Sequence, residues 1–371
     1  MKTAGIIAEY NPFHNGHEYH INMTRDLTGA DGIVAVLSGN FVQRGEAAIC
    51  DKYARAQMAL QGGADLVVEL PCVYACQSAE FFAKGGVGVL EKLGCDYISF
   101  GMESENMEEL VEIAKKVKNP DEDFKTRLAD ALKEGTSYPK ALAKALGTEI
   151  VDTPNNVLAI EYLKAVENLK PIGIRRRGSL HDQPGSASDV RKRLGNGEDI
   201  AKLVSTYTAD ILREQKQPDI RIFESLVLYK LRTMSAEEIG RLPDVTEGLE
   251  NRIKDAALKA TSLEELCELV KTKRYTMARI RRVFVNAILG ITKDDLGLSP
   301  QYIRVLGMNE TGMKILANLR DKTDIPVITK TADAKMCRML EIDINASDVY
   351  SLLTGNKAMA DYTNSPIIIK D

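Results

Sequence analysis

The sequence predicts an α/β protein: a Rossmann-like, doubly wound parallel sheet followed by a mainly helical C-terminal domain. Apolar runs alternate with helical segments over the first hundred residues, the pattern of parallel strands joined by crossover helices. Residues 32–37 are apolar throughout, as in a strand buried on both faces. After residue 200 the strand pattern fades and amphipathic helices follow one another. Because 371 residues exceed one typical core, we expect domains at 1–200 and 201–371.

The periodicity of apolar residues places the individual elements. We expect strands at 2–9, 32–37, 65–69, 96–100 and 171–174, and helices between them at 16–27, 53–61, 78–93 and 154–168. Residues 106–147 and 206–322 are predicted to be mostly helical, with one more strand at 325–331. In a doubly wound sheet, ligands bind beyond the carboxyl ends of the strands, so the turns that follow the strands are the first candidates for a site.

Composition narrows the class of protein. The formal net charge of −4 gives no overall basic character, so a nucleic-acid surface would have to be a local patch. No apolar run is long enough to span a bilayer, and the N-terminus shows no signal peptide. The six cysteines form no Cys-x-x-Cys pair, which favours free thiols over a zinc site. We therefore expect a cytoplasmic location, no membrane partner and no metal held by the protein.

The junction at residues 5–20 carries the strongest indication of chemistry. An apolar run leads into a turn and then into a helix, and three of the four histidines lie there, with His14 and His17 flanking Asn15-Gly16. Glycine lets the backbone approach a bound group, and a helix N-terminus attracts anions. Imidazole N–H groups can stabilise charge that develops on a phosphate. We predict a nucleotide site with His14 and His17 as catalytic residues; the alternatives are histidines that cap the helix or, less well supported, bind a metal.

A second candidate region follows the strand predicted at 171–174. Arg175, Arg176 and Arg177 come directly after it, and residues 186–191 open a helix, with Ser188 or Asp189 as its cap. Guanidinium groups and a second helix N-terminus could hold the β- and γ-phosphates opposite the histidines. The alternative is a solvated basic turn. The glycines at 85–88 lack the dinucleotide spacing, and the sequence contains no Walker motif.

One basic concentration lies in the helical half of the chain. It is suited to contact a phosphate backbone, and an ordinary solvated helix face is an equal alternative. Its members are Lys271, Lys273, Arg274, Arg279, Arg281 and Arg282, with Tyr275 among them.

Residues 14–17 match the His-x-Gly-His motif of the nucleotidyltransferase superfamily related to class I aminoacyl-tRNA synthetases, and residues 186–191 resemble its second motif. A closer resemblance covers nearly the whole chain. Residues 9–17, 38–46, 154–156 and 302–307 resemble the bacterial tRNA(Met) cytidine acetate ligase family. Residues 9–17 and the Ser-Gly-Asn-Phe block at 38–41 are specific to this family.

The resemblance implies an HxGH nucleotidyltransferase fold and a two-step ligase. ATP and acetate would give acetyl-adenylate and pyrophosphate, and the wobble cytidine of elongator tRNA(Met) would take the acetyl group on N4. Mg²⁺ would accompany ATP. Gly101 would admit the adenosine, Asn155 or Asn156 would donate to the nucleotide, and Arg175 and Arg176 would hold pyrophosphate. The residues implied for ATP are Ile7, Ala8, Glu9, Tyr10, Asn11, Pro12, Phe13, His14, Asn15, Gly16, His17, His20, Gly101, Asn155, Asn156, Arg175, Arg176, Ser188 and Arg191.

Two smaller sets of site residues concern acetate and tRNA. Asn40 and Phe41 are suggested for an acetate pocket, and the basic concentration at 271–282 for tRNA. Two other functions stay open: transfer of a nucleotidyl group to a small phosphorylated acceptor, and ATP sensing by a non-catalytic RNA-binding protein. Intact His14 and His17 argue against the second. The sequence leaves the oligomeric state open.

Overall fold

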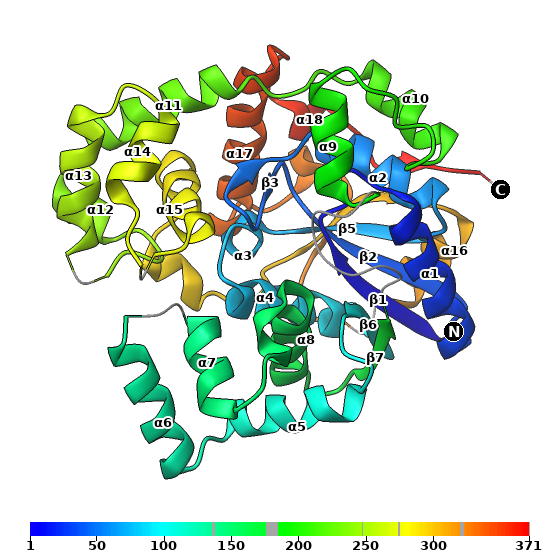
Figure 1. Ribbon diagram of the computed structural model, residues 1–371. Helices are drawn as coiled ribbons and strands as arrows, with labels where there is room; N and C mark the ends of the chain where they lie inside the picture. The colour runs from blue at the N-terminus through cyan, green and yellow to red at the C-terminus, as the bar shows by residue number, and fades with distance from the viewer. Residues whose placement is uncertain (136–137, 176–184, 247, 274, 320–322, 371) are drawn as a thin grey trace.

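The computed structural model describes residues 1–135, 138–175, 185–246, 248–273, 275–319 and 323–370. The chain is arranged around a central β-sheet. Its strand order is β10-β8-β5-β2-β1-β6-β7, with β9 paired to β8 outside this path (Figure 1). A separate hairpin pairs β3 with β4. The strands are β1 (Thr3–Ala8), β2 (Gly32–Ser38), β3 (Phe41–Val42), β4 (Glu46–Ala47), β5 (Leu66–Leu70), β6 (Tyr97–Met102), β7 (Lys170–Arg175), β8 (Ile303–Met308), β9 (Val327–Ile328) and β10 (Ile367–Ile368).

The doubly wound arrangement is confirmed, with one exception. β1 pairs in parallel with β2 and β6, β2 with β5, and β6 with β7. The expectation of an all-parallel sheet is wrong at β8, which runs antiparallel to β5 with a register shift between Val67 and Val68. Residues 303–308 were expected to be helical; instead their apolar side chains are buried within the sheet. Pairing between segments more than two hundred residues apart leaves no trace in local periodicity.

Helices occupy most of the remaining chain. The α-helices are α1 (Asn15–Thr28), α2 (Lys52–Gln61), α3 (Cys72–Ala75), α4 (Ala79–Lys92), α5 (Met107–Lys118), α6 (Glu122–Lys133), α7 (Tyr138–Leu146), α8 (Pro154–Ala165), α9 (Ala187–Gly195), α10 (Thr206–Glu214), α11 (Ile220–Thr233), α12 (Ala236–Gly240), α13 (Leu249–Lys259), α14 (Leu263–Val270), α15 (Met277–Leu289), α16 (Glu310–Leu319), α17 (Arg338–Thr354) and α18 (Ala360–Thr363). Short 3-10 helices are η1 (Ile150–Asp152), η2 (Lys293–Gly297) and η3 (Thr331–Asp333).

Helices cover both faces of the sheet, as β2 illustrates. Val34 and Val36 contact the core that contains α4 and α8, whereas Ile33, Ala35 and Leu37 contact the core that contains α1, α2 and α10. All seven residues of β2 are buried. This explains why the segment is apolar throughout instead of alternating.

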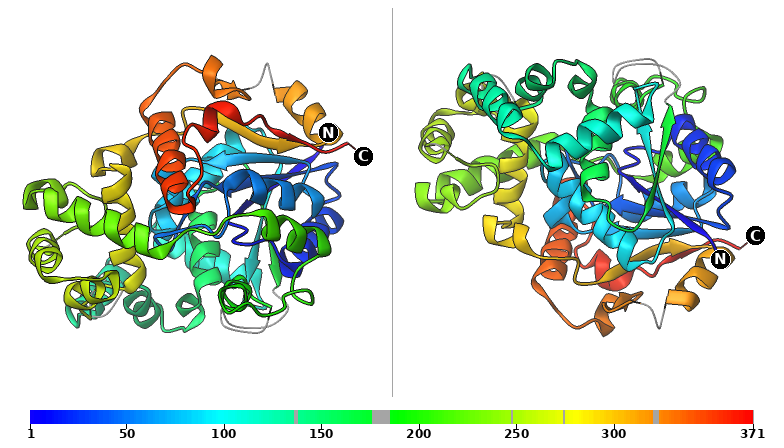
Figure 2. Two further views of the ribbon diagram at one scale, coloured as in Figure 1. Left: turned by 90° about the horizontal axis from the view of Figure 1, so that it is seen from above. Right: turned by 90° about the horizontal axis from the view of Figure 1, so that it is seen from below.

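The helices α11 to α15 form a lobe beside the sheet, with α17 between the two (Figures 1 and 2). α17 packs against α3 of the sheet layer and against α11 and α15 of the lobe. The termini lie together on the side away from this lobe. The domain boundary near residue 200 stays a prediction, but the sheet does not follow it, since β8 and β10 come from beyond residue 300.

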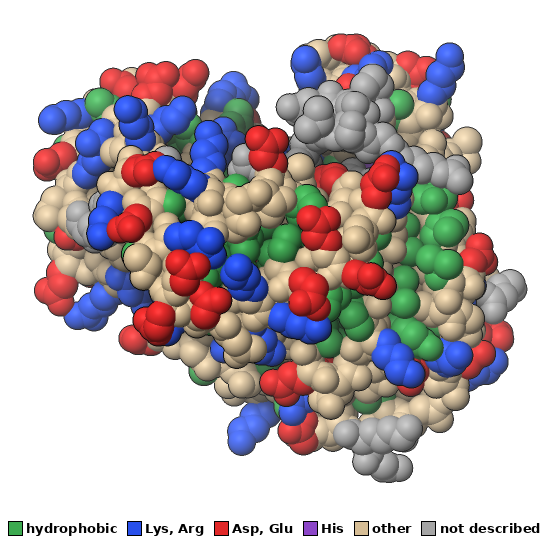
Figure 3. Space-filling view, turned by 60° about the horizontal axis from the view of Figure 1, so that its bottom comes forward, with side chains coloured by type: hydrophobic (Ala, Val, Ile, Leu, Met, Phe, Trp, Pro, Cys, Tyr) green, Lys and Arg blue, Asp and Glu red, His purple; other side chains and the backbone are tan. Residues whose placement is uncertain are grey.

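The surface carries charges of both signs. On the face drawn in Figure 3, Lys and Arg side chains intermingle with Asp and Glu over most of the area. Among the helices in the described part of the chain, none has the length and apolar content required to cross a membrane.

Candidate active site

His14 and His17 form the N-terminal cap of α1. His14 is the N-cap residue, and its Nδ1 accepts a hydrogen bond from the Gly16 N–H at 3.0 Å. The His17 Nδ1 in turn accepts from the His14 N–H at 3.3 Å, and the rings stack with centroids 3.8 Å apart. When Nδ1 accepts, the proton of a neutral ring is on Nε2. The predicted cap and the predicted anion site are therefore one structure: capping orients both rings at the helix end where an anion is favoured.

The carboxyl end of β1 is accessible although the strand is central. Ile7, Ala8 and Glu9 are partly exposed, and so is Gly101 on the neighbouring strand β6, while β2 on the other side is buried. We call Ile7, Ala8 and Glu9 the open strand end. It leads directly into the turn before His14, so a ligand beyond the sheet edge could reach both the strand end and the helix N-terminus.

The side chains between the open strand end and His14 hold the turn together. Tyr10, Phe13 and Asn11 are buried. Asn11 Oδ1 accepts from the Ile49 N–H at 2.8 Å, and the Asn11 carbonyl accepts from Arg191 at 2.6 Å. We conclude that these side chains shape the site, whereas Asn15, Gly16 and His17 remain accessible at the helix end.

His20 lies about one turn further along α1. Its Nε2 is 2.9 Å from Ser99 Oγ, and the Thr24 hydroxyl is 2.7 Å from the same oxygen. Ser99 is buried in β6. The side chain of His20 thus fixes α1 to the sheet, a supporting position for the pair at the helix start.

The contacts at the turn after β6 distinguish Asn155 from Asn156, which the sequence left as alternatives. Asn156 is buried, and its Oδ1 accepts from the N–H groups of Glu103 and Ser104 at 2.9 and 3.2 Å. Asn155 is half-buried and donates to the Glu103 carboxylate. Asn156 therefore fixes the turn beside Gly101, and Asn155 is the more accessible of the two.

The second motif meets the first through Arg191 of α9. Besides binding the Asn11 carbonyl, Arg191 donates to Ser188 Oγ at 3.4 Å. The expected cap was wrong: Ser186, not Ser188 or Asp189, caps α9, accepting from the Asp189 N–H at 3.2 Å. The Asp189 carboxylate instead accepts from the Gly185 N–H, which lowers its pKa together with Arg193. The cap lies two or three residues earlier than expected, at Ser186, which has the extended backbone that a cap requires.

Arg175 ends β7 and is exposed, with Glu105 as its partner. It is paired in register with Met102 of β6, so it lies at the same carboxyl edge of the sheet as Gly101. Arg176 and Arg177 lie outside the described residues.

The side chains suggested for an acetate pocket have structural partners. Asn40 Oδ1 accepts from the Lys52 N–H at 2.8 Å, and its Nδ2 donates to Ser347 Oγ at 3.3 Å. Phe41 is fully buried, edge-on to Tyr350. Both side chains point into the core, because the turn is covered by α17.

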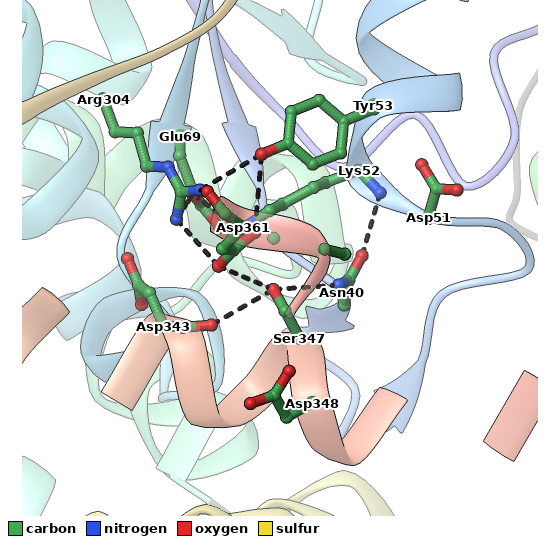
Figure 4. A network of polar contacts seen from close by, with 12 residues as sticks. Asn40, Asp51, Lys52, Tyr53, Glu69, Arg304, Asp343, Ser347, Asp348 and Asp361 are labelled. Carbon is green, nitrogen blue, oxygen red and sulfur yellow. Dashed lines mark hydrogen bonds and ion pairs between the residues drawn. The ribbon is translucent and has the colours of Figure 1, made fainter. Parts of the chain in front are cut away.

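Sequence reasoning missed two buried groups of charges. Arg55 is fully buried, and its guanidinium donates to the carbonyls at the ends of β1 and β2, including Glu9 at 2.7 Å and Ser38 at 2.9 Å. The larger group, which we call the buried ion network, joins α2, β5, β8 and α18 (Figure 4). Its members are Lys52, Glu69, Arg304 and Asp361. Charged residues on helices and strands are usually predicted to face solvent, so no local pattern marked these.

The basic concentration at 271–282 divides into two kinds of residue. Arg282 pairs with Asp244 at 2.8 Å and is 12% exposed. Arg279 donates to the Asp244 carbonyl and stacks on Tyr275. Arg281 is 46% exposed, and Lys271 and Lys273 are exposed; Arg274 lies outside the described residues. Among the described members of this concentration, Lys271, Lys273 and Arg281 are thus exposed, and Arg279 and Arg282 are held by the segment around Asp244.

Metal-binding side chains do not converge anywhere in the part of the chain that the structure describes: no group of three or more His, Cys, Asp or Glu could hold an ion. The described cysteines are free thiols, as expected.

A sheet open at β1 and β6 and paired histidines at the following helix define a nucleotidyltransferase-type protein. The model of the HIGH Nucleotidyl Transferase family matches residues 1–365. A protein of Thermoanaerobacter sp. (strain X514) named tRNA(Met) cytidine acetate ligase is 41% identical, with 97% of each chain covered. A protein of the same name from Clostridium perfringens (strain ATCC 13124) is 37% identical over the whole of both chains. The chain thus belongs to the tRNA(Met) cytidine acetate ligase family.

Solved structures agree with this assignment. The crystal structure of Thermotoga maritima TmcAL in its apo form I matches with a TM-score of 0.92, 30% identity and full coverage of both chains. The same protein bound with alpha-thio ATP matches with a TM-score of 0.91, again at 30% identity over the full length of both chains.

Proposed function

We propose that this protein activates acetate with ATP and transfers the acetyl group to N4 of the wobble cytidine of elongator tRNA(Met). The observation that carries the proposal is the histidine pair at the open strand end, in a chain 41% identical to a protein named for this activity. Attack of acetate on the α-phosphate gives acetyl-adenylate and pyrophosphate, and cytidine N4 then displaces AMP.

In the first step the chain supplies position and charge. His14 and His17 would donate Nε2 protons to the oxygens of the α-phosphate as negative charge grows there. The N–H groups and dipole of α1 act in the same direction. Gly101 would lie under the adenosine, with Asn155 donating to it. Arg175 and Arg176 would hold the departing pyrophosphate, and Arg191 of the second motif would contact ATP.

Mg²⁺ would enter with ATP. Magnesium is commonly held by substrate phosphates and waters with one or two carboxylates, so it needs no preformed protein cage. We assign no step to the ion.

The acetate pocket stays proposed at the Asn40–Phe41 turn. Since the side chains of Asn40 and Phe41 have partners inside the core, recognition there would use the backbone. The tRNA would lie along α15 and the segment before it, contacting Lys271, Lys273 and Arg281. A cytoplasmic location follows if tRNA is the acceptor.

The test uses purified protein with ATP, acetate and unmodified elongator tRNA(Met), followed by digestion and mass analysis of the nucleosides. We expect N4-acetylcytidine only when both ATP and acetate are present. Pyrophosphate without an RNA product would instead support a small acceptor. ATP binding with neither product would support a sensor.

A further inference from the structure

Glu9 combines accessibility with a central position. It follows the last residue of β1, lies five positions before His14, and is partly exposed although β1 lies between β2 and β6. A reacting group beyond the sheet edge could therefore meet both the carboxylate of Glu9 and the histidine pair. Its sequence neighbour Tyr10 is buried, so Glu9 is the partly exposed residue at this point of the turn.

The carboxylate is held in one orientation by the protein. Glu9 Oε1 accepts a hydrogen bond from the Gln43 N–H at 2.7 Å. The backbone carbonyl of Glu9 accepts a second hydrogen bond, from Arg55, at 2.7 Å. Among the residues that the structure describes, no donor contacts the second oxygen, Oε2. One oxygen is thus used for positioning and the other is available to a reactant.

The surroundings of Glu9 make its carboxylate more basic than a carboxylate in water. Burial raises the pKa of the Glu9 carboxyl, and Glu46 adds to this, while the Gln43 N–H, Arg44 and Arg191 oppose it. Tyr162 of α8 also faces this carboxyl. A carboxylate with a raised pKa accepts a proton more readily than one in water.

The β3–β4 hairpin, which holds Glu9, also contacts the helix proposed for tRNA. Gly45, at φ +73°, packs against the backbone of Arg281 and Arg282, where an added Cβ would be 2.4 Å from backbone atoms. Glu46 Oε2 is 3.9 Å from Arg281, and its Oε1 is 3.4 Å from Arg191. Glu9 therefore lies between the proposed ATP site and the proposed RNA surface, where cytidine and acetyl-adenylate must meet.

We propose that Glu9 is the general base of acetyl transfer, a role that rests on the function proposed above. The N4 nitrogen of cytidine attacks the acetyl carbonyl carbon and a C–N bond forms. The bond from that carbon to the phosphate oxygen breaks, and AMP leaves with the bonding electrons. The N4 proton passes to Glu9 Oε2. A base is needed because the exocyclic amine of cytidine is a weak nucleophile that must lose this proton.

The two half-reactions separate this role from others. Glu9→Gln keeps the acceptor for the Gln43 N–H but cannot take a proton. We expect it to retain acetate-dependent ATP–pyrophosphate exchange, while single-turnover acetyl transfer to tRNA(Met) falls about 10²–10⁴-fold. Glu9→Asp should recover part of the transfer. The rise of the transfer rate with pH should be present in wild type and absent from Glu9→Gln.

Glu122→Gln, an exposed carboxylate on α6 paired only with Lys125, is the matched control and should leave both half-reactions unchanged. Loss of exchange and transfer together in Glu9→Gln, with native circular dichroism, would overturn the proposal, as would retention of both. Absence of exchange and of RNA product in wild type would overturn the proposed function itself, which distinguishes the two failures.

Discussion

The two sides of the carboxyl edge of the sheet hold polar residues in opposite ways. At the carboxyl ends of β1 and β6, Ile7, Ala8, Glu9 and Gly101 are partly exposed. Of the histidine pair at the start of α1, His17 is partly exposed and His14 is buried. At β5 and β8 the side chains of Lys52, Glu69, Arg304 and Asp361 are at most 3% exposed, and two cations meet two carboxylates. The first side can exchange a ligand with solvent, and the second cannot. A polar cluster thus indicates chemistry only where a ligand can enter; the buried one joins the returning C-terminal segment to the sheet.

The largest effect expected from this comparison is on stability. Lys52→Met should leave two buried carboxylates, Glu69 and Asp361, with Arg304 as their one remaining cation in the buried ion network, since Lys52 Nζ lies 2.7 Å and 3.0 Å from them. Breaking a buried ion pair from one side costs about 3–5 kcal/mol. Urea unfolding at neutral pH measures this loss in the free energy of unfolding. Lys125→Met, which removes an exposed pair on α6, should change the free energy of unfolding by less than about 1 kcal/mol. Equal stabilities for the two variants would refute the distinction.

On the open side, the expected loss is in rate. His17→Ala should lower acetate-dependent pyrophosphate release by about 10²–10³-fold, the usual cost of one donor to developing charge. Its free energy of unfolding should fall by only about 1 kcal/mol, because one capping contact is lost. Parallel kinetics and urea titration give both numbers. Turnover at the wild-type rate would remove His17 from the catalytic group.

Near the buried ion network, Asp343 should make the free energy of unfolding depend on pH. Burial, with Glu69 nearby, raises the pKa of Asp343 from 3.8 to about 7. The unfolded chain loses this proton near pH 4 and the folded chain near pH 7. The free energy of unfolding should therefore decline between these values and then level off. Asp343→Asn should remove that decline, as urea midpoints measured across the window would show. An unchanged slope in the variant would assign the titration to other groups.

The smallest effects concern α15. Arg281→Ala should weaken tRNA binding and reduce the salt dependence of log K by about one counterion, leaving stability unchanged. Arg282→Ala should instead lower stability through Asp244 and change tRNA binding less. Filter binding at several salt concentrations, with thermal unfolding, separates the two. A larger loss of tRNA binding in Arg282→Ala than in Arg281→Ala would place the RNA on the face of α15 that carries Arg282.

Much of the open side could be predicted from sequence, because its determinants are local. The strand before Glu9, the turn at Asn15-Gly16 and the helix after it occupy one continuous stretch, and the paired histidines mark its end. The network side could not be predicted. Arg304 meets Glu69 only because β8 returns to pair with β5, and a charged side chain in a strand gives no local indication of burial. The division of Arg281 from Arg282 likewise depends on Asp244, which is distant in sequence.

The location of ATP is the central claim, and hydrogen–deuterium exchange of the full chain with and without ATP tests it most directly. We predict slower exchange at residues 9–17, at 101–104 and at 155–156, with no change at 52–55 or 303–308. The N–H groups at the start of α1 should show the largest change, since they would bind phosphate. Protection confined to residues 52–55 and 303–308, with none at 9–17, would contradict the account.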